Sequence, residues 1–176
     1  MKKVWLLGAT MALAFGSTPA IAADTCPVTA ICASNPAGIV TALQTLGYKA
    51  VLGKSESSGS PKISSAASGY TFDIFFYDCT KGAECGSITF LINFSKDPVN
   101  SASLANEWNK TKRVSAMSFD ETDGMLTLSY DASTVGGLSQ ANFADVVNWW
   151  DAILGEARTF FKAYPAPAET VSPKKS

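Results

Sequence analysis

Apolar and polar residues alternate regularly in the middle of the chain. From Tyr70 to Cys79 and again from Gly86 to Phe94, a large apolar side chain occupies every second position. This period is typical of a β-strand that buries one face. Because a short glycine-containing segment joins the two runs, the pattern predicts an antiparallel hairpin. Of two shorter runs before it, Tyr48–Leu52 predicts a strand, and Lys62–Ser65 is compatible with a further short strand that the predicted order does not count.

A second hairpin is predicted later in the chain. Its expected strands are Val114–Phe119 and Met125–Tyr130. Asp123 and Gly124 lie between them, and both residue types tolerate the positive φ angles of a tight turn.

Three other segments have the apolar spacing of a helix. Ser34, Asn35 and Pro36 form a start signal for the first helix, which Gly47 ends. The second is expected from about Ser101 to Lys110, with Leu104 and Trp108 on one face. The third begins near Ser139 and has the longest apolar stripe, with a period of 3.6 residues. The members of this stripe are Phe143, Val146, Val147, Trp150, Ile153, Leu154, Ala157, Phe160 and Phe161.

These elements predict an α+β fold in the order α-β-β-β-α-β-β-α. Hairpins pair their strands antiparallel. We therefore expect a twisted antiparallel sheet, built from two hairpin units, with the three helices packed mainly over one face.

The first 23 residues have the features of a secretory signal peptide. Lys2 and Lys3 precede an apolar run of about 13 residues, and Ala20-Ile21-Ala22 forms a small-x-small cleavage site. The run is shorter than the ~20 residues that span a bilayer, which argues against a membrane anchor. We expect cleavage, no membrane span in the remaining chain, and a periplasmic or secreted protein.

The rest of the chain is expected to form one domain with two flanking segments. Residues 24–35 are an N-terminal segment that carries two cysteines, and residues 36–164 are the folded domain. Residues 165–176 are rich in Pro, Ala, Ser and Lys without apolar periodicity, so they predict a disordered tail.

Four cysteines in an exported chain predict disulfide bonds. Cys79 and Cys85 stand at the two ends of the predicted hairpin strands, where they can bond to each other. Cys26 and Cys32 lie close together in the N-terminal segment, so a second local bond is expected. Neither spacing matches a common zinc site or a C-x-x-C redox site, and the chain has no His.

Charge and composition argue against several classes of function. The formal net charge is −1, so the chain lacks the basic surplus of a nucleic-acid-binding protein. The absence of His removes Ser-His-Asp and Cys-His catalysis. Asp73 and Asp78 are five residues apart on one predicted strand, so they point to opposite faces and do not form a paired-carboxylate site.

The loop from Asp120 to Gly124 bears a superficial likeness to a calcium site. It lacks the ligand spacing and the final Glu of an EF-hand, so a plain hairpin turn is the favoured interpretation. No metal or other cofactor is expected.

Polar and aromatic residues near the second helix are the first candidates for binding. Asn106, Trp108, Asn109 and Arg113 could together recognise a partner's backbone or a carbohydrate. The favoured alternative is structural, with Trp108 in the core and the Asn side chains bonded to backbone groups.

Trp149 is the second candidate. Adjacent residues on a helix differ by about 100°, so Trp149 and Trp150 cannot both face the core. Trp150 lies within the apolar stripe and Trp149 at its edge, where it could be an interface residue or could cover the margin of the sheet.

An ordered set of short motifs resembles the YbjN family, described as bacterial sensory transduction regulators. The resemblance covers about residues 36–161, and it implies a fold similar to that of type III secretion chaperones. It implies no enzyme activity, cofactor or catalytic residue. The motifs are Gly47-Tyr48, Pro61-Lys62-Ile63, Phe76-Tyr77-Asp78-Cys79 with Cys85, the run from Asn106 to Arg113, Asp123-Gly124, Gly136-Gly137, and Asn142-Phe143 with Trp149-Trp150.

The chaperone-like fold implies a non-catalytic envelope protein that binds another protein or a second copy of itself. An exported member cannot contact DNA, so any regulatory role would act within the envelope. The alternative function is a small-molecule or glycan-binding module that uses Tyr77, Trp108 and Trp149. A carboxylate-dependent hydrolase is a distant third.

Overall fold

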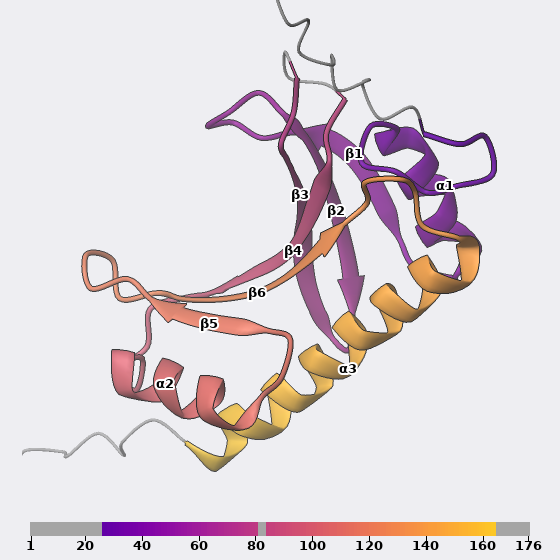
Figure 1. Ribbon diagram of the computed structural model, residues 1–176. Coiled ribbons are helices and arrows are strands. Elements are labelled where there is room, and N and C mark those ends of the chain that lie inside the picture. Colours follow the sequence, from indigo (N-terminus) through magenta and orange to yellow (C-terminus); the bar gives the residue numbers. More distant parts are fainter. Residues whose placement is uncertain (1–25, 81–83, 165–176) are drawn as a thin grey trace, which may run out of the picture.

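The computed structural model describes residues 26–80 and 84–164 of the chain. The predicted signal peptide and the predicted tail lie outside these residues. The described part is a six-stranded antiparallel sheet with three helices, an α+β fold as the sequence predicts (Figure 1).

The strands follow the order β1-β2-β3-β4-β6-β5 across the sheet. Both predicted hairpins are present, as β3 with β4 and β5 with β6. Both short runs before them are also strands, so the group before the second helix has four strands where the predicted order has three. The elements are α1 (Pro36–Thr45), β1 (Ala50–Lys54), β2 (Pro61–Ala67), β3 (Tyr70–Tyr77), β4 (Ser87–Phe94), α2 (Ala102–Thr111), β5 (Ala116–Phe119), β6 (Leu126–Ser133) and α3 (Gln140–Ala163).

Each helix begins at a side-chain cap, which explains why its start is readable in the sequence. Asn35, Ser101 and Ser139 each accept a hydrogen bond from the backbone N–H three residues later. Gly47 ends α1 with φ +91°, and the N–H of Tyr48 donates to the C=O of Leu43 at 3.0 Å. This Schellman ending keeps Tyr48 in the turn, so β1 begins two residues later than predicted.

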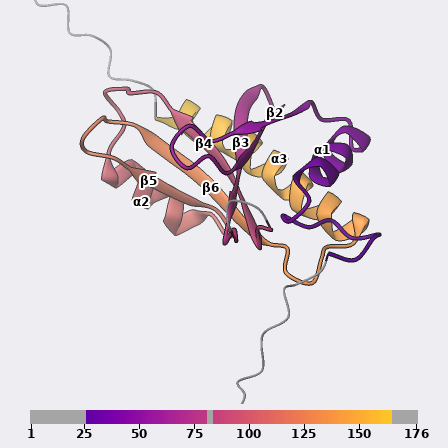
Figure 2. The ribbon, with the colours of Figure 1, turned by 90° about the horizontal axis from the view of Figure 1, so that it is seen from above.

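The helices all lie along one side of the sheet, as predicted (Figure 1). Figure 2 shows α3 running beneath the sheet, with α1 and α2 near opposite ends. The centre of the core is aromatic: the ring of Trp150 on α3 lies 5.6 Å from that of Phe72 and 5.7 Å from that of Phe90. The apolar faces of β3 and β4 therefore pack on α3, and their other faces carry no helix within the described ranges.

The folded unit begins before α1. Ile31 forms a β-bridge with Leu138, and the buried N–H of Ala33 donates to Thr134 Oγ1 at 2.8 Å. The same hydroxyl donates to the C=O of Gly86 at 3.0 Å. Thr134 thus joins the N-terminal segment to the ends of β4 and β6, and Cys32 is buried there.

Candidate functional site

A hollow beside α3 brings together two of the predicted binding residues. The Arg113 guanidinium lies 5.4 Å from the centre of the Trp149 ring, within the range of a cation–π contact. Arg113 belongs to the connection between α2 and β5, and Val114 follows it. The hollow has a volume of about 390 Å³ and is lined by Trp149, Arg113, Val114, Lys112, Ile153 and Glu156, among others. We call these six residues the Trp149 surface.

The orientation of Trp149 follows from helix geometry. Trp150 is 0% exposed and lies in the aromatic core, whereas Trp149 is 36% exposed. Successive helical residues are about 100° apart, so burying Trp150 turns Trp149 toward the edge of the helix. The prediction that the two indoles have different environments is confirmed.

An ion pair holds the α2–β5 connection against α3. Lys112 Nζ lies 3.1 Å from Glu156 Oε2, and the same ammonium lies 5.6 Å from the centre of the Trp108 ring. Both charged groups are partly exposed, so the pair contributes at most about 1 kcal/mol. Its main effect is to fix the connection that carries Arg113 and Val114.

Val114 has an unusual backbone conformation. Its φ is +64°, in the left-handed region that β-branched residues rarely adopt, and its side chain is 46% exposed. Such strain costs roughly 1 to 3 kcal/mol and is concentrated at functional sites. Because of this left-handed turn, β5 begins at Ala116, two residues after the predicted start at Val114.

Trp108 and Asn109 serve the fold. The Trp108 ring is fully buried, packs on Phe160 at 5.3 Å, and donates its Nε1–H to Ser115 Oγ at 3.2 Å. The Asn109 amide donates to the C=O of Met117 and accepts from its N–H, at 2.9 and 2.8 Å. The core and β5 therefore engage both side chains, which is the structural role that the sequence favours for them.

The other two candidates lie apart from the Trp149 surface. Asn106 is exposed on α2, and Tyr77 ends β3 with its side chain on the helix-free face of the sheet. Trp149 projects from α3 on the opposite side. Tyr77, Trp108 and Trp149 therefore do not form one aromatic cleft, and the glycan site proposed from them is not assembled.

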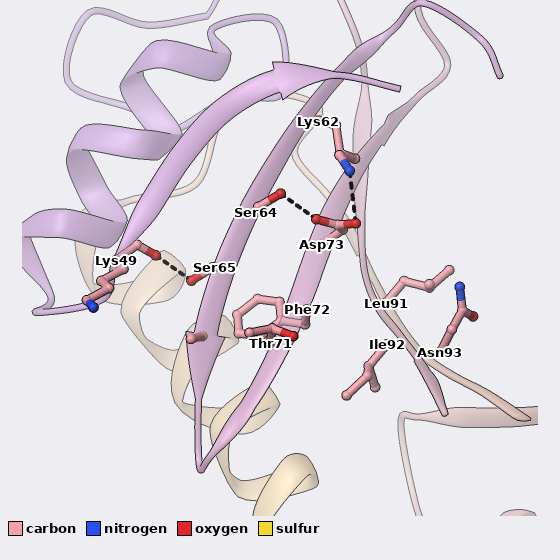
Figure 3. Close-up of a pocket in the computed structure, with 11 residues that line it drawn as sticks. Lys49, Lys62, Ser64, Ser65, Thr71, Phe72, Asp73, Leu91, Ile92 and Asn93 are labelled. Atoms are coloured by element: carbon pink, nitrogen blue, oxygen red, sulfur yellow. Dashed lines mark hydrogen bonds and ion pairs between the residues drawn. The ribbon is translucent and has the colours of Figure 1, made fainter. Parts of the chain in front are cut away.

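The helix-free face of the sheet has a hollow of about 540 Å³ near β2 and β3 (Figure 3). Asp73 occupies its centre, where Lys62 Nζ lies 3.1 Å from one carboxylate oxygen and Ser64 Oγ donates to the other at 2.6 Å. Both oxygens of Asp73 are therefore engaged. Asp78 follows the end of β3, outside the strand that it was predicted to share with Asp73, and accepts from Ser87 Oγ at 2.7 Å. The two carboxylates therefore have separate partners.

The Asp120–Gly124 segment is a hairpin turn. Asp120 accepts from the N–H of Thr122, and Asp123 from that of Met125. The bond from Thr122 lowers the pKa of the Asp120 carboxyl. No group of three potential metal-ligating acidic or cysteine side chains occurs within residues 26–80 and 84–164.

Two local disulfides join Cys26 to Cys32 and Cys79 to Cys85, the pairs that the sequence predicts. Both lie at the end of the sheet where the N-terminal segment is attached, and cysteines of both bonds line one hollow. Disulfides are compatible with a protein outside the cytoplasm. None of the described helices is long and apolar enough to cross a membrane.

Comparisons with known proteins identify a family. The YbjN model, described as "Putative bacterial sensory transduction regulator", matches residues 35–163. Among solved structures, the chain is similar to a crystal structure of YbjN, "a putative transcription regulator from E. coli", with 15% identity and a TM-score of 0.49; the match covers 70% of this chain and 91% of that chain. No curated protein matches. Because the family model spans most of the sequence, the protein belongs to the YbjN family.

Proposed function

We propose that this protein is a non-catalytic protein-binding module that acts outside the cytoplasm, and that the Trp149 surface is its contact with a partner. One observation carries the proposal: an exposed indole and an exposed, strained valine line the same hollow, while the adjacent Trp150 supplies the core.

The chemistry of the surface suits a protein partner. Trp and Arg are enriched among the residues that dominate binding energy at protein interfaces. Trp149 is partly held by Arg113, so little side-chain freedom remains to be lost on binding. Arg113 forms no ion pair with any residue in the described part of the chain, which leaves its charge available for a partner's carboxylate or carbonyl.

A photo-crosslinking amino acid placed at position 149 tests this contact. In cells that express the protein, we expect a discrete crosslinked product, either a heterologous complex or a covalent dimer. The same amino acid at position 77, which is also exposed but on the other side of the sheet, is the matched control. Crosslinking from position 77 alone, or from neither position, would contradict the proposal.

Export is a separate part of the proposal. It is supported by the signal-like features of residues 1–23 and by the two disulfides. Intact mass spectrometry of the protein from fractionated cells should give a chain that starts at Ala23 or Asp24, in the periplasm or medium. A full-length chain in the cytoplasmic fraction would show that this part is wrong.

A further inference from the structure

The two edges of the sheet differ in how their outward backbone groups are covered. β1 and β5 are the outer strands. On β5, the side-chain amide of Asn109 bonds both the N–H and the C=O of Met117. A side chain from α2 therefore takes the place of a neighbouring strand at that edge.

The edge of β1 lacks this cover at Leu52. Lys54 is opposite Pro61, which has no N–H, so these two residues cannot exchange a pair of hydrogen bonds. Bonded and non-bonded pairs alternate along an antiparallel ladder, so the N–H and C=O of Leu52 also point away from β2. Ala50 fits the same alternation, because its C=O accepts from Gln44 Nε2 at 3.2 Å. No loop, cap or side-chain bond to the backbone of Leu52 occurs within the described residues.

The side chains of this edge are apolar and exposed. Val51 is 68% exposed and Leu52 is 45% exposed. A hollow of about 510 Å³ lies at the same end of the strand, with Leu52 and Lys54 on one side and the start of α1, at Pro36, on the other. An open strand edge with apolar side chains readily pairs with another chain.

The charges around the edge select the partner. Lys49 and Lys54 flank the exposed part of β1, and neither forms an ion pair within the described ranges. The first turn of α1 beside the hollow has no acidic residue. If two copies paired antiparallel through β1 around Leu52, Lys54 of one copy would lie opposite Ala50 of the other and Lys49 opposite Ser55, so neither lysine would lie directly opposite an acidic residue.

We propose that the edge of β1 binds an extended, acidic segment of a partner protein, which adds to the sheet as a further strand. The segment's backbone bonds the free N–H and C=O of Leu52. Its carboxylates lie near Lys49 and Lys54, and an apolar residue covers Leu52. This site is separate from the Trp149 surface and does not depend on it.

Designed peptides test the proposal on the full chain. The probe is a fluorescein-labelled nonapeptide with a central Leu, a Val on each side of it and Glu at the other positions, so that both faces of the added strand carry carboxylates. A peptide with Lys in place of Glu is its counterpart. We expect the acidic peptide to bind at least about tenfold more tightly, measured by fluorescence anisotropy. Two further acidic peptides carry N-methyl groups at alternate residues, in the two possible registers. One register should abolish binding and the other should preserve it, because only every second N–H faces β1.

Two measurements on the protein locate the site. Hydrogen exchange at the Leu52 amide should slow when the acidic peptide is added. Lys54→Glu should weaken binding about tenfold, whereas Lys162→Glu, with the same charge change at the far end of α3, should not. Trp149→Ala should leave the peptide affinity unchanged, which separates this site from the Trp149 surface.

Several results would overturn the proposal. These are no binding of the acidic peptide, equal binding of the Lys peptide, equal binding of both N-methylated registers, or an unchanged affinity in Lys54→Glu. Protection of the Leu52 amide by dimerisation of the protein alone would assign the edge to a second copy instead.

Discussion

Val114 has a backbone conformation that costs free energy at a position where its side chain contacts solvent. Replacing it with Gly removes the left-handed penalty of roughly 1 to 2 kcal/mol and adds about 0.5 to 1 kcal/mol of backbone entropy. We expect Val114→Gly to raise the free energy of unfolding by up to about 1 kcal/mol and to lower crosslinking from position 149. Urea unfolding measures the first effect.

Val114→Asn is the control for this prediction, because Asn also tolerates positive φ but restores a side chain of similar size. It should gain stability like the Gly variant. A loss of stability in both variants would show that the valine side chain packs productively and that its backbone is not strained.

Tyr48 gives the fold a pH dependence in the alkaline range. Burial, and then the charge of Asp151 and its hydrogen bond with the Tyr48 hydroxyl, raise the pKa of this tyrosine. As the pH rises above about 10, Tyr48 therefore ionises in the unfolded chain before it ionises in the folded protein. The stabilisation that the protonated Tyr48 hydroxyl gives the fold is complete below that pH and is lost above it. The burial of Tyr130 and the charge of Asp145 raise the pKa of Tyr130 in the same way.

Urea unfolding at about pH 8 and about pH 11 tests the role of Tyr48. We expect Tyr48→Phe to lose less stability between the two values than the wild-type protein loses. An identical loss in both proteins would mean that the hydroxyl of Tyr48 is not the group responsible.

At the scale of elements, Asn109 links α2 to β5 by two hydrogen bonds to Met117. Asn109→Ala removes both and exposes the β5 edge, so we expect the free energy of unfolding to fall by about 1 to 3 kcal/mol. Asn106→Ala on the exposed side of the same helix is the matched control and should change it by less than about 0.5 kcal/mol. Equal effects of the two substitutions would contradict this role.

The helices and strands could be predicted from the sequence because the local sequence signals agree with the final fold. The alternation of Phe72, Ile74 and Phe76 matches a strand that packs on α3, and Asn35, Ser101 and Ser139 cap the helices that they were expected to start. Strand order was not readable. The pairing of β4 with β6 depends on contacts between segments far apart in sequence, for which period and turn residues carry no information.

The candidate site could be predicted from the sequence only in part, because some of its features depend on contacts between distant segments. The exposure of Trp149 follows from its spacing to Trp150, which is local. The position of Val114 depends on a φ angle that its residue type opposes, and the burial of Trp108 and the bonds of Asn109 depend on α3 and β5. The open edge of β1 also became visible only with the register opposite Pro61.

At the scale of the whole molecule, the two disulfides stabilise the end of the sheet where the N-terminal segment attaches. By chain entropy, each small ring contributes roughly 2 kcal/mol. The double substitution Cys79→Ser and Cys85→Ser should lower the free energy of unfolding by about that amount and leave the fold intact. Nonreducing peptide mapping should recover Cys26–Cys32 in the variant; a Cys26–Cys79 bond in the wild type would contradict the local pairing.

The central claim is that adjacent indoles on α3 have different tasks, and one comparison tests it directly: thermal unfolding and crosslinking yield for Trp149→Ala and Trp150→Ala. Crosslinks are formed in cells with a lysine-reactive reagent. Trp150 is buried against Phe72 and Phe90, so Trp150→Ala should cost about 3 to 5 kcal/mol. Trp149→Ala should cost about 1 kcal/mol and abolish most partner crosslinks.

Trp150→Phe keeps this comparison interpretable if the Ala variant fails to fold. Among the described residues, Trp150 Nε1 has no hydrogen-bond partner, so Phe retains most of the packing and loses no bond. We expect Trp150→Phe to keep the wild-type crosslinking yield while Trp149→Ala loses it at nearly wild-type stability. Equal destabilisation by the two Ala substitutions, with no selective loss of crosslinks in Trp149→Ala, would contradict the account.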